Sequence, residues 1–214
     1  MLTSKDYSTI FHEIKNSITL IGSSLQLVEK KHPEIVNFPY WTESMSEITF
    51  LRNMVTELST AGLCGKLNLR PVDLYSYIDN VRCSFSTLSP NNFQCDIISP
   101  KNLPPVQIDP LLMKQALTNL LKNAYEAMNR SGTVVIQLTS LSSAVRIDII
   151  DHGGGLDPSL ADKIFKPFIT SKDCGSGLGL AITRQIIESH HGTITCDSRP
   201  GDGCTFTICL PYIE

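Results

Sequence analysis

A histidine, an acid and an amide stand close together in the N-terminal stretch FHEIKNSI, as His12, Glu13 and Asn16. A neutral imidazole is a competent nucleophile near pH 7, and a neighbouring carboxylate can hold or accept its proton. His12 directly follows the apolar Phe11, which puts it beside the apolar stripe of a helix rather than within it. Asn16 lies one helical turn later on the same face. The group fits an exposed nucleophilic histidine, although an ordinary solvated helix face would accept the same residues.

Two asparagines share one face of a second predicted helix, over residues 110–129. Asp109 can cap this helix, and Pro110 suits its first position. Asn119 and Asn123 are four residues apart, so they point the same way. Exposed asparagines are common on helices, so the pair alone favours an ordinary surface over a binding site.

A glycine-rich turn, IIDHGGGLDP, follows a β-rich run that ends at Asp151. Gly153, Gly154 and Gly155 permit positive φ and let the backbone approach a ligand closely. Asp151, at the end of a strand, could accept a hydrogen bond from an exocyclic amine. Taken alone, this position favours an ordinary turn aspartate.

A second glycine-rich loop opens the segment KDCGSGLGLAITRQIIESHHG and runs directly into a helix. Backbone N–H groups at the start of a helix form an anion site, so phosphate is the natural ligand. The spacing of Gly175, Gly177 and Gly179 matches neither the dinucleotide fingerprint G-x-G-x-x-G after a first strand nor the P-loop pattern G-x-x-x-x-G-K-[ST]. His190 and His191, at the other end of the segment, indicate the end of the helix.

The N-terminal part of the chain has the pattern of a helical hairpin. Apolar residues recur at steps of three and four, as in the seam between packed helices, and Pro33 and Pro39 separate two such runs. The first run consists of Phe11, Ile14, Ile18, Ile21, Leu25 and Val28, and the second of Met45, Ile48, Leu51, Val55 and Leu58. One hairpin leaves an apolar face uncovered, so we expect two copies to form a dimeric four-helix bundle.

From about residue 67 the pattern changes. Short β-rich runs alternate with helical stretches that start near Asp73, Pro110 and Gly177. Strands gathered in pairs between helices predict an α+β fold in which a mixed sheet is layered against helices. The predicted domains are therefore the helical hairpin, residues 1–63, and an α/β sandwich, residues 67–214.

The composition excludes several classes of protein. A net charge of −3 and a pI of about 5.9 argue against nucleic acid or an anionic membrane as the main partner. No apolar run approaches the roughly 20 residues that span a bilayer, and the opening MLTSKDYSTI lacks the apolar centre of a signal peptide. Seven cysteines without a C-x-x-C pair indicate free thiols in a reducing compartment. We expect a cytoplasmic protein whose own chain makes no membrane contact.

In their order and spacing, these segments together resemble the sensor histidine kinases of two-component signalling. NLLKNAYEA, DHGGG, IFKPFITSK, GSGLGLAI and GDGCTFTICLP closely resemble the Asn box, first glycine box, Phe box, second glycine box and closing strand of that family. The resemblance covers about residues 67–211 and implies a Bergerat-type (GHKL) ATP-binding domain. FHEIKN resembles the phosphoacceptor box of the dimerisation hairpin, which implies that His12 is phosphorylated.

The same resemblance implies roles for the residues of the nucleotide site. Asn123 would bind Mg²⁺, Asn119 would lie beside the phosphates, and Asp151 would bind the adenine amine of ATP. The glycine boxes would admit the base and cradle the triphosphate, through Gly153, Gly155, Gly175, Gly177, Leu178 and Gly179. Phe165 and Phe168 match the Phe box, or they simply pack a lid against the sheet.

On the hairpin, the resemblance implies that His12 is autophosphorylated with Mg-ATP and then passes the phosphoryl group to an aspartate of a response-regulator receiver domain. Glu13 would be the acid that handles the imidazole proton. Asn16 would orient a water that dephosphorylates the regulator. Ser17 departs from the family pattern, because many relatives have a proline there that kinks the helix; we expect a smaller bend or none.

Two alternative functions compete with this one. ATPases of the gyrase, mismatch-repair and heat-shock chaperone type have a water-activating Glu where Asn119 stands and lack the HExxN hairpin, so the sequence argues against them. The second is a phosphotransfer or scaffold protein with an inactive nucleotide site. The intact Asn123, Asp151 and glycine loop argue against this alternative, which a measurement of ATP binding tests.

Overall fold

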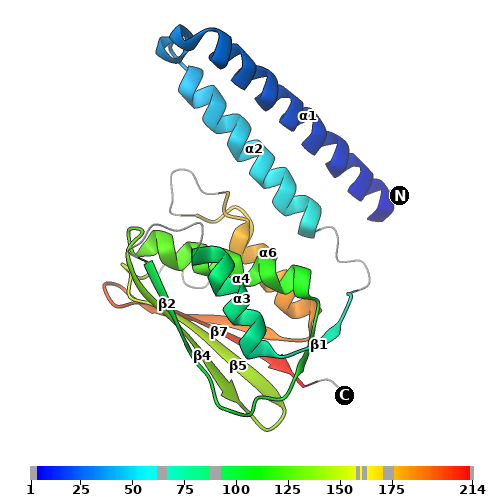
Figure 1. Cartoon of the computed structure of the whole chain (residues 1–214), viewed down its shortest axis with the longest axis vertical. Helices are drawn as coiled ribbons and strands as arrows, with labels where there is room; N and C mark the ends of the chain where they lie inside the picture. Colours follow the sequence, from blue (N-terminus) through cyan, green and yellow to red (C-terminus); the bar gives the residue numbers. More distant parts are fainter. Residues whose placement is uncertain are drawn as a thin grey trace. The chain divides into compact units, whose positions relative to one another are not determined.

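The computed structural model describes the backbone of residues 4–61, 67–86, 93–157, 160, 163–170 and 176–212. Within these ranges it describes all side chains except those of residues 4–12, 50, 53–54 and 56–61. The chain forms two compact units (Figure 1). One contains residues 1–65 and 168–178, and the other contains residues 66–167 and 179–214.

Residues 4–61 form a helical hairpin, as the apolar periodicity predicts. Helix α1 (Ser4–Lys31) ends in two lysines, which suit the negative end of the helix dipole. A short 3₁₀ helix, η1 (Pro33–Asn37), begins with a proline that cannot continue α1. Helix α2 (Trp41–Ala61) then returns along α1. Trp41 Nε1 donates a hydrogen bond to Glu29 Oε2 at 3.3 Å, which ties the two helices together near the turn.

Apolar side chains of the hairpin remain exposed along the predicted seam. Val55 is buried, but Ile14, Ile21 and Leu51 are 40%, 51% and 40% exposed. Exposed apolar residues that recur at helical spacing indicate a surface that a partner can cover. Among the seam residues whose side chains are described, the hairpin therefore leaves part of its apolar stripe exposed.

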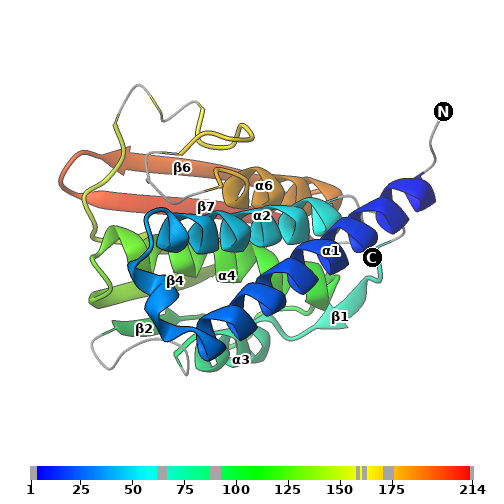
Figure 2. The ribbon, with the colours of Figure 1, turned by 90° about the horizontal axis from the view of Figure 1, so that it is seen from above.

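The second unit is built on a five-stranded mixed sheet in the order β2-β4-β5-β7-β6. Strands β2 and β4 are parallel, and the other neighbours are antiparallel. Helices cover one face of the sheet, where α4 and α6 lie side by side (Figure 2). The predicted α/β sandwich is confirmed. The sheet contains β2 (Phe93–Ile98), β4 (Gly132–Ser140), β5 (Ala144–Asp151), β6 (Thr193–Arg199) and β7 (Gly203–Pro211), and the helices are α3 (Leu74–Ser86), α4 (Pro110–Ala127) and α6 (Gly179–Ser189). A separate antiparallel pair joins β1 (Arg70–Val72) to β3 (Val106–Ile108).

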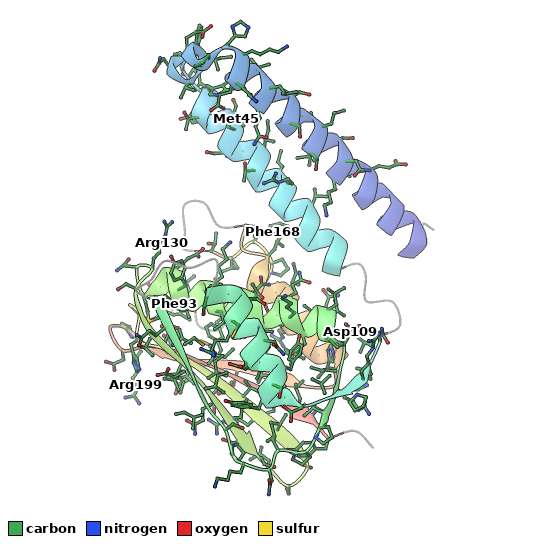
Figure 3. All side chains as sticks on the ribbon, viewed as in Figure 1. Met45, Phe93, Asp109, Arg130, Phe168 and Arg199 are labelled. Atoms are coloured by element: carbon green, nitrogen blue, oxygen red, sulfur yellow. The ribbon has the colours of Figure 1, made fainter. Side chains whose placement is uncertain are left out.

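Helix α4 crosses the core and carries the asparagine pair. It begins as predicted, directly after Asp109, which is labelled in Figure 3. Asp109 Oδ1 accepts hydrogen bonds from Leu111 N at 3.0 Å and Leu112 N at 3.3 Å. It ends before the predicted residue 129, because Asn129 already has a left-handed φ of 53°. Its buried face consists of Leu112, Met113, Ala116, Leu117, Leu120, Leu121 and Ala124.

Two further expectations concern membranes and thiols. Among the described residues, no helix has both the length and the apolar character needed to cross a membrane. The cysteines in this part of the chain are free thiols, namely Cys83, Cys95, Cys196, Cys204 and Cys209. Cys64 and Cys174 lie outside the described residues.

Candidate functional site

Asp151 is a buried carboxylate at the end of β5, with 3% of its surface exposed. Its Oδ1 accepts hydrogen bonds from Gly153 N at 2.9 Å and from Cys204 N at 3.3 Å. Burial raises the pKa of Asp151, and the two backbone donors partly offset this rise. Because both donors contact Oδ1, Oδ2 can accept a hydrogen bond from an amine of a bound molecule. Asp151 thus closes the turn with one oxygen and can present the other to a ligand.

The glycines after Asp151 are required by the packing of the protein itself. A Cβ on Gly153 would lie 2.7 Å from the carbonyl oxygen of Ala127, at the end of α4. Gly155 has a φ of +71°, and a Cβ there would collide with the carbonyl oxygen of Arg199. Neither position accepts a side chain unless the backbone shifts. These contacts hold the end of α4 against the turn that carries Asp151, while the role of the two glycines in admitting a base stays a prediction.

Asn119 links α4 to the first turn of α6. Its Nδ2 donates hydrogen bonds to Gly179 O at 3.2 Å and to Thr183 Oγ1 at 3.5 Å. Thr183 Oγ1 in turn donates to Gly179 O at 2.8 Å. Asn123 lies one turn further along the same face of α4, is half-buried and has an interaction of its own. The asparagine pair therefore lies next to the start of α6, which the glycine loop precedes in the chain.

Thr183 is a buried polar residue that sequence reasoning missed. It lies four residues after Gly179, on the side of α6 that faces α4. Its position in a predicted amphipathic helix could have identified this face. The identity of its partner, Asn119, could not be read from local spacing because the two residues are 64 positions apart.

The asparagine pair could bind a hard cation only together with oxygen atoms of a bound ligand. Both hydrogen bonds of Asn119 use the amide nitrogen, and an asparagine oxygen is a ligand that Mg²⁺ accepts. Within the described ranges, no group of three or more His, Cys, Asp or Glu side chains could hold a metal ion by itself. A cation here would depend on Asn123 and on phosphate oxygens, as Mg²⁺ commonly does in nucleotide sites.

The predicted phosphate loop is described from residue 176 onward, and Gly175 lies outside the described residues. Gly177 has a φ of +65°, and a Cβ there would lie 2.6 Å from the backbone carbon of Phe168. Phe168 N donates a hydrogen bond to Gly177 O at 3.0 Å, so this segment closes on itself. Leu178 is buried, and α6 begins at Gly179. The local geometry requires glycine at position 177 whether or not a ligand binds there.

The two phenylalanines of the Phe box differ in their surroundings. Phe165 packs edge-on against Phe206 of β7, with ring centroids 6.4 Å apart, and the Arg184 guanidinium lies 5.9 Å from the Phe165 ring centroid. Phe168 is 65% exposed. Packing against the sheet therefore accounts for Phe165 and not for Phe168.

The predicted phosphoacceptor residues lie on α1. The side chain of His12 lies outside the described residues, whereas Glu13 and Asn16 are exposed. Helix α1 continues without a break through Ser17, whose Oγ donates a hydrogen bond to Glu13 O at 3.0 Å. The helix is thus uninterrupted at the position where many relatives have proline. The catalytic roles of His12, Glu13 and Asn16 stay predictions.

His190 joins two helices that carry the site, a role that its sequence context does not predict. Its Nε2 accepts a hydrogen bond from Asp109 N at 2.8 Å, and its Nδ1 donates to Ile186 O at 2.7 Å. This arrangement requires a neutral imidazole with the proton on Nδ1. The next residue, His191, has a φ of 59°, as expected for the residue that follows a helix. His190 therefore joins the end of α6 to the start of α4.

Comparison with known proteins assigns a family to this arrangement. Residues 108–214 match the family described as histidine kinase-, DNA gyrase B-, and HSP90-like ATPase. The signal transduction histidine-protein kinase AtoS of Escherichia coli (strain K12) is 33% identical over 205 residues, which are 94% of this chain and 34% of AtoS. This chain therefore spans about a third of the length of that relative.

Two solved structures extend the comparison. The catalytic domain of the histidine kinase ThkA is 31% identical, with a TM-score of 0.62, and the match covers 68% of this chain and 97% of that domain. ThkA in complex with the response regulator protein TrrA is 27% identical, with a TM-score of 0.69, and the match covers 96% of this chain and 60% of ThkA.

Proposed function

Because this chain belongs to the sensor histidine kinases and carries their ATP-binding ATPase domain, we propose that it phosphorylates His12 with Mg-ATP and passes the phosphoryl group to an aspartate of a response regulator. One observation carries the proposal above the others. Asp151 is a buried carboxylate whose Oδ1 is held by two backbone donors, which leaves Oδ2 to recognise an amine.

In this proposal Asp151 selects the base of the nucleotide. Oδ2 accepts a hydrogen bond from the exocyclic amine of adenine, whereas guanine has a carbonyl oxygen at that position and would be repelled. The glycine loop, residues 175–179, binds the triphosphate at the start of α6. Asn119 lies beside the phosphates, and Asn123 holds Mg²⁺. Bound Mg²⁺ would neutralise the negative charge that develops on the phosphate oxygens.

His12 is the nucleophile of the proposed reaction. One nitrogen of its neutral imidazole attacks the γ-phosphorus, so that a P–N bond forms while the P–O bond to ADP breaks. The other ring nitrogen then gives its proton to Glu13, the adjacent carboxylate. Phosphoryl transfer needs little more from the protein, because positioning and charge neutralisation supply most of the rate.

The receiver domain would then take the phosphoryl group onto an aspartate oxygen, so that the P–N bond breaks while Glu13 returns the proton and restores the neutral imidazole. We include in the proposal that the unstimulated protein also removes phosphate from its regulator. Asn16 is exposed one helical turn after His12, where its amide can orient a water toward an aspartyl phosphate.

An Asn16→Ala variant tests this second activity. Phosphate on a purified regulator should decay more slowly with this variant than with the wild type, while labelling of His12 persists. Gln26→Ala, which removes an exposed amide elsewhere on α1, is the matched control and should leave the decay unchanged. Equal decay with Asn16→Ala and wild type would reduce Asn16 to a surface residue.

The hairpin is the proposed dimer interface. Ile14, Ile21 and Leu51 remain exposed on the predicted seam, and a second copy would cover them in a four-helix bundle. The proposed division is a dimerisation and phosphotransfer hairpin at residues 1–63 and a catalytic domain at residues 67–214. We place the protein in the cytoplasm, where its free thiols would stay reduced.

Incubation with labelled ATP and Mg²⁺ tests the central claim. The wild type should acquire a label that is labile in acid and stable in base, as a phosphoramidate is, and His12→Gln should not. His32→Gln is the matched control, because His32 is the other histidine of the hairpin and its Nδ1 lies 3.1 Å from Glu34 Oε1. Equal labelling of His12→Gln and wild type would refute the assignment.

The alternative, a phosphotransfer or scaffold protein with an inactive nucleotide site, makes a different prediction. Such a protein would not bind ATP, yet it would accept phosphate from a phosphorylated partner. Calorimetric titration of the wild type with ATP and Mg²⁺ separates the two functions. Saturable ATP binding excludes the scaffold function, whereas a folded protein that does not bind ATP would support it.

A further inference from the structure

Cys196 of β6 and Cys204 of β7 lie on the same face of the sheet. Strand pairing sets Ser198 opposite Cys204 and Phe206 opposite Cys196. Paired residues, and residues two apart on one strand, share a face, so the two thiols are diagonal neighbours. Cys204 is buried and Cys196 is partly exposed.

The surroundings of Cys204 favour its ionised form. Cys204 Sγ lies 3.2 Å from Ser198 Oγ, and the Cys196 thiol is its diagonal neighbour on the same face of the strand pair. Interaction with the Cys196 thiol lowers the pKa of Cys204, and the same interaction raises the pKa of Cys196. Cys204 is therefore the more easily ionised thiol, and a second thiol lies within its reach.

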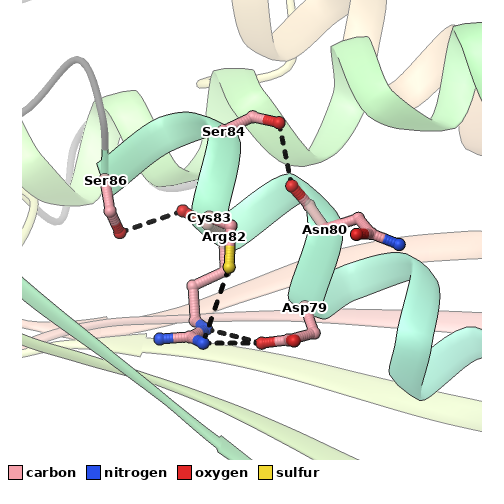
Figure 4. Close-up of polar contacts among 6 residues, drawn as sticks. All are labelled: Asp79, Asn80, Arg82, Cys83, Ser84 and Ser86. Atoms are coloured by element: carbon pink, nitrogen blue, oxygen red, sulfur yellow. Dashed lines mark hydrogen bonds and ion pairs between the residues drawn. The ribbon is translucent and has the colours of Figure 1, made fainter.

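Three other cysteines occupy different surroundings. Cys209 is on β7 but faces the opposite side of the sheet, because it is an odd number of residues from Cys204. Cys95 is buried in β2, at the other edge of the sheet. Cys83 is exposed on α3, with Arg82 Nη2 3.8 Å from its Sγ (Figure 4). These cysteines provide internal comparisons for the reactivity of the pair.

Cys204 also forms part of the surroundings of Asp151. It pairs with Asp151 across β5 and β7, and its N–H donates to Asp151 Oδ1 at 3.3 Å. The preceding Gly203 approaches so closely that a Cβ there would collide with the carbonyl oxygen of Asp151. Ser198, which contacts Cys204 Sγ, also accepts a hydrogen bond from Leu156 N at 2.8 Å, just after the glycine turn. A shift of Cys204 would therefore change the geometry of the Asp151 carboxylate.

We propose that Cys196 and Cys204 are a redox-sensitive modification site, which peroxide oxidises to a disulfide that weakens nucleotide binding at Asp151. The inference rests on the proposed function, in which Asp151 binds adenine. The Cys204 thiolate attacks one oxygen of hydrogen peroxide, which gives a sulfenic acid and, once the leaving hydroxide is protonated, water. The Cys196 sulfur then attacks the sulfenic sulfur, so that an S–S bond forms and a second water leaves. The two thiols lose two electrons in all, and the peroxide gains them.

Closing this bond requires the strands to move. Diagonal neighbours of an antiparallel pair have Cα atoms roughly 7–8 Å apart, whereas a disulfide needs roughly 4.4–6.8 Å. The disulfide therefore draws β7 toward β6 at Cys204 and away from Asp151 on β5. Loss of the backbone donor at Asp151 would turn the carboxylate out of its binding orientation. We expect the affinity for ATP to fall by about tenfold, the effect of one hydrogen bond to a charged group.

The test uses the full chain, treated with hydrogen peroxide or kept reduced, followed by removal of the peroxide. Peptide mapping after alkylation should recover Cys196 and Cys204 as one linked pair, while Cys209 is alkylated. ATP titration should show about tenfold weaker binding after oxidation, and dithiothreitol should restore it. Cys196→Ser should bind ATP equally before and after peroxide, whereas Cys209→Ser should respond like the wild type.

The inference and the proposed function fail in different ways. A reduced protein that does not bind ATP refutes the proposed function and with it the coupling to Asp151. A reduced protein that binds ATP, but whose oxidised form lacks the Cys196–Cys204 link or binds ATP equally well, overturns the redox inference alone. A loss of affinity that persists in Cys196→Ser also overturns it, because the effect would then arise elsewhere.

Discussion

Replacing Asp151 with asparagine keeps the shape of the side chain and turns one carboxylate oxygen into an NH₂ group. Asp151 Oδ1 accepts hydrogen bonds from the N–H groups of Gly153 and Cys204. Because both partners are donors, the asparagine oxygen must take this position, and its NH₂ group then takes the position of Oδ2. The Asp151→Asn variant should therefore present a donor where the wild type presents an acceptor.

The exchange of an acceptor for a donor determines how much nucleotide binding is weakened. Loss of a hydrogen bond between a charged carboxylate and the adenine amine costs about 1.5–3 kcal/mol, which is about ten- to a hundredfold in affinity. The facing amine of adenine then meets a second donor, so the weakening should reach the upper part of this range. Guanine has a carbonyl oxygen at that position, so the affinity for GTP should stay level or rise.

The same substitution should not destabilise the empty protein. Burial raises the pKa of Asp151, so the protonated carboxyl group contributes its full share of stability when the pH is below the pKa of the unfolded state. That contribution is lost as the pH rises through the higher pKa of the folded state. At neutral pH the ionised carboxylate therefore costs stability, and the neutral asparagine should melt at the same or a higher temperature. Reduced ATP binding together with undiminished stability separates recognition from folding.

Calorimetric titration with ATP and GTP, with thermal melting as the test of folding, measures both quantities. Asp148→Asn is the matched control: Asp148 is also a buried carboxylate of β5, but it binds Arg146 and Thr207 on the opposite face of the sheet. Acidification should weaken ATP binding by the wild type at a higher pH than for an ordinary carboxylate, and Asp151→Asn should lack this step. Unchanged affinity for ATP in a folded Asp151→Asn protein would refute the assignment of the base-binding residue.

Two further predictions follow from close contacts in the second unit. Gly203→Ala should lower the free energy of unfolding by at least about 1–3 kcal/mol, because φ is +92° and the new Cβ collides with the Asp151 carbonyl oxygen. Gly201→Ala is the control, because Gly201 has a similar φ of +87° but open space around it. Its free energy of unfolding should fall less in the same urea titration. His190→Ala should lower it by about 1–3 kcal/mol by leaving the buried Asp109 N–H without its acceptor, and an unchanged urea midpoint would contradict that role.

The elements that depend on local signals could be predicted from the sequence. The hairpin follows from apolar residues at steps of three and four, interrupted by Pro33. The start of α4 follows from Asp109 before Pro110, a pairing of cap and first helical residue that acts within a few residues. Asp151 could be singled out because a strand, an acid and a glycine turn follow one another directly in the chain.

The contacts that complete the site depend on residues far apart in the chain. His190 and Asp109 are 81 positions apart, and the capping pattern around His190 says nothing of that partner. The need for glycine at position 153 comes from the end of α4, where the Ala127 carbonyl leaves no room for a Cβ. Ligand approach and backbone packing both require glycine, so a sequence pattern cannot tell them apart. The pairing of Cys196 with Cys204 is hidden for a related reason, because it depends on the register of β6 and β7.

Contacts between residues far apart in the chain hold α4, and with it Asn123, in place. His190 holds the backbone of Asp109, which caps the start of α4, and Asn119 binds its middle to α6 through Gly179. Gly153 admits the end of α4 against the turn after β5. A helix fixed at its start, middle and end has little freedom to slide or rotate, so the half-buried amide of Asn123 keeps its position relative to Asp151. Base recognition at Asp151 and cation binding at Asn123 would then both depend on how α4 is held, and a substitution at either end of α4 should affect both without touching the nucleotide.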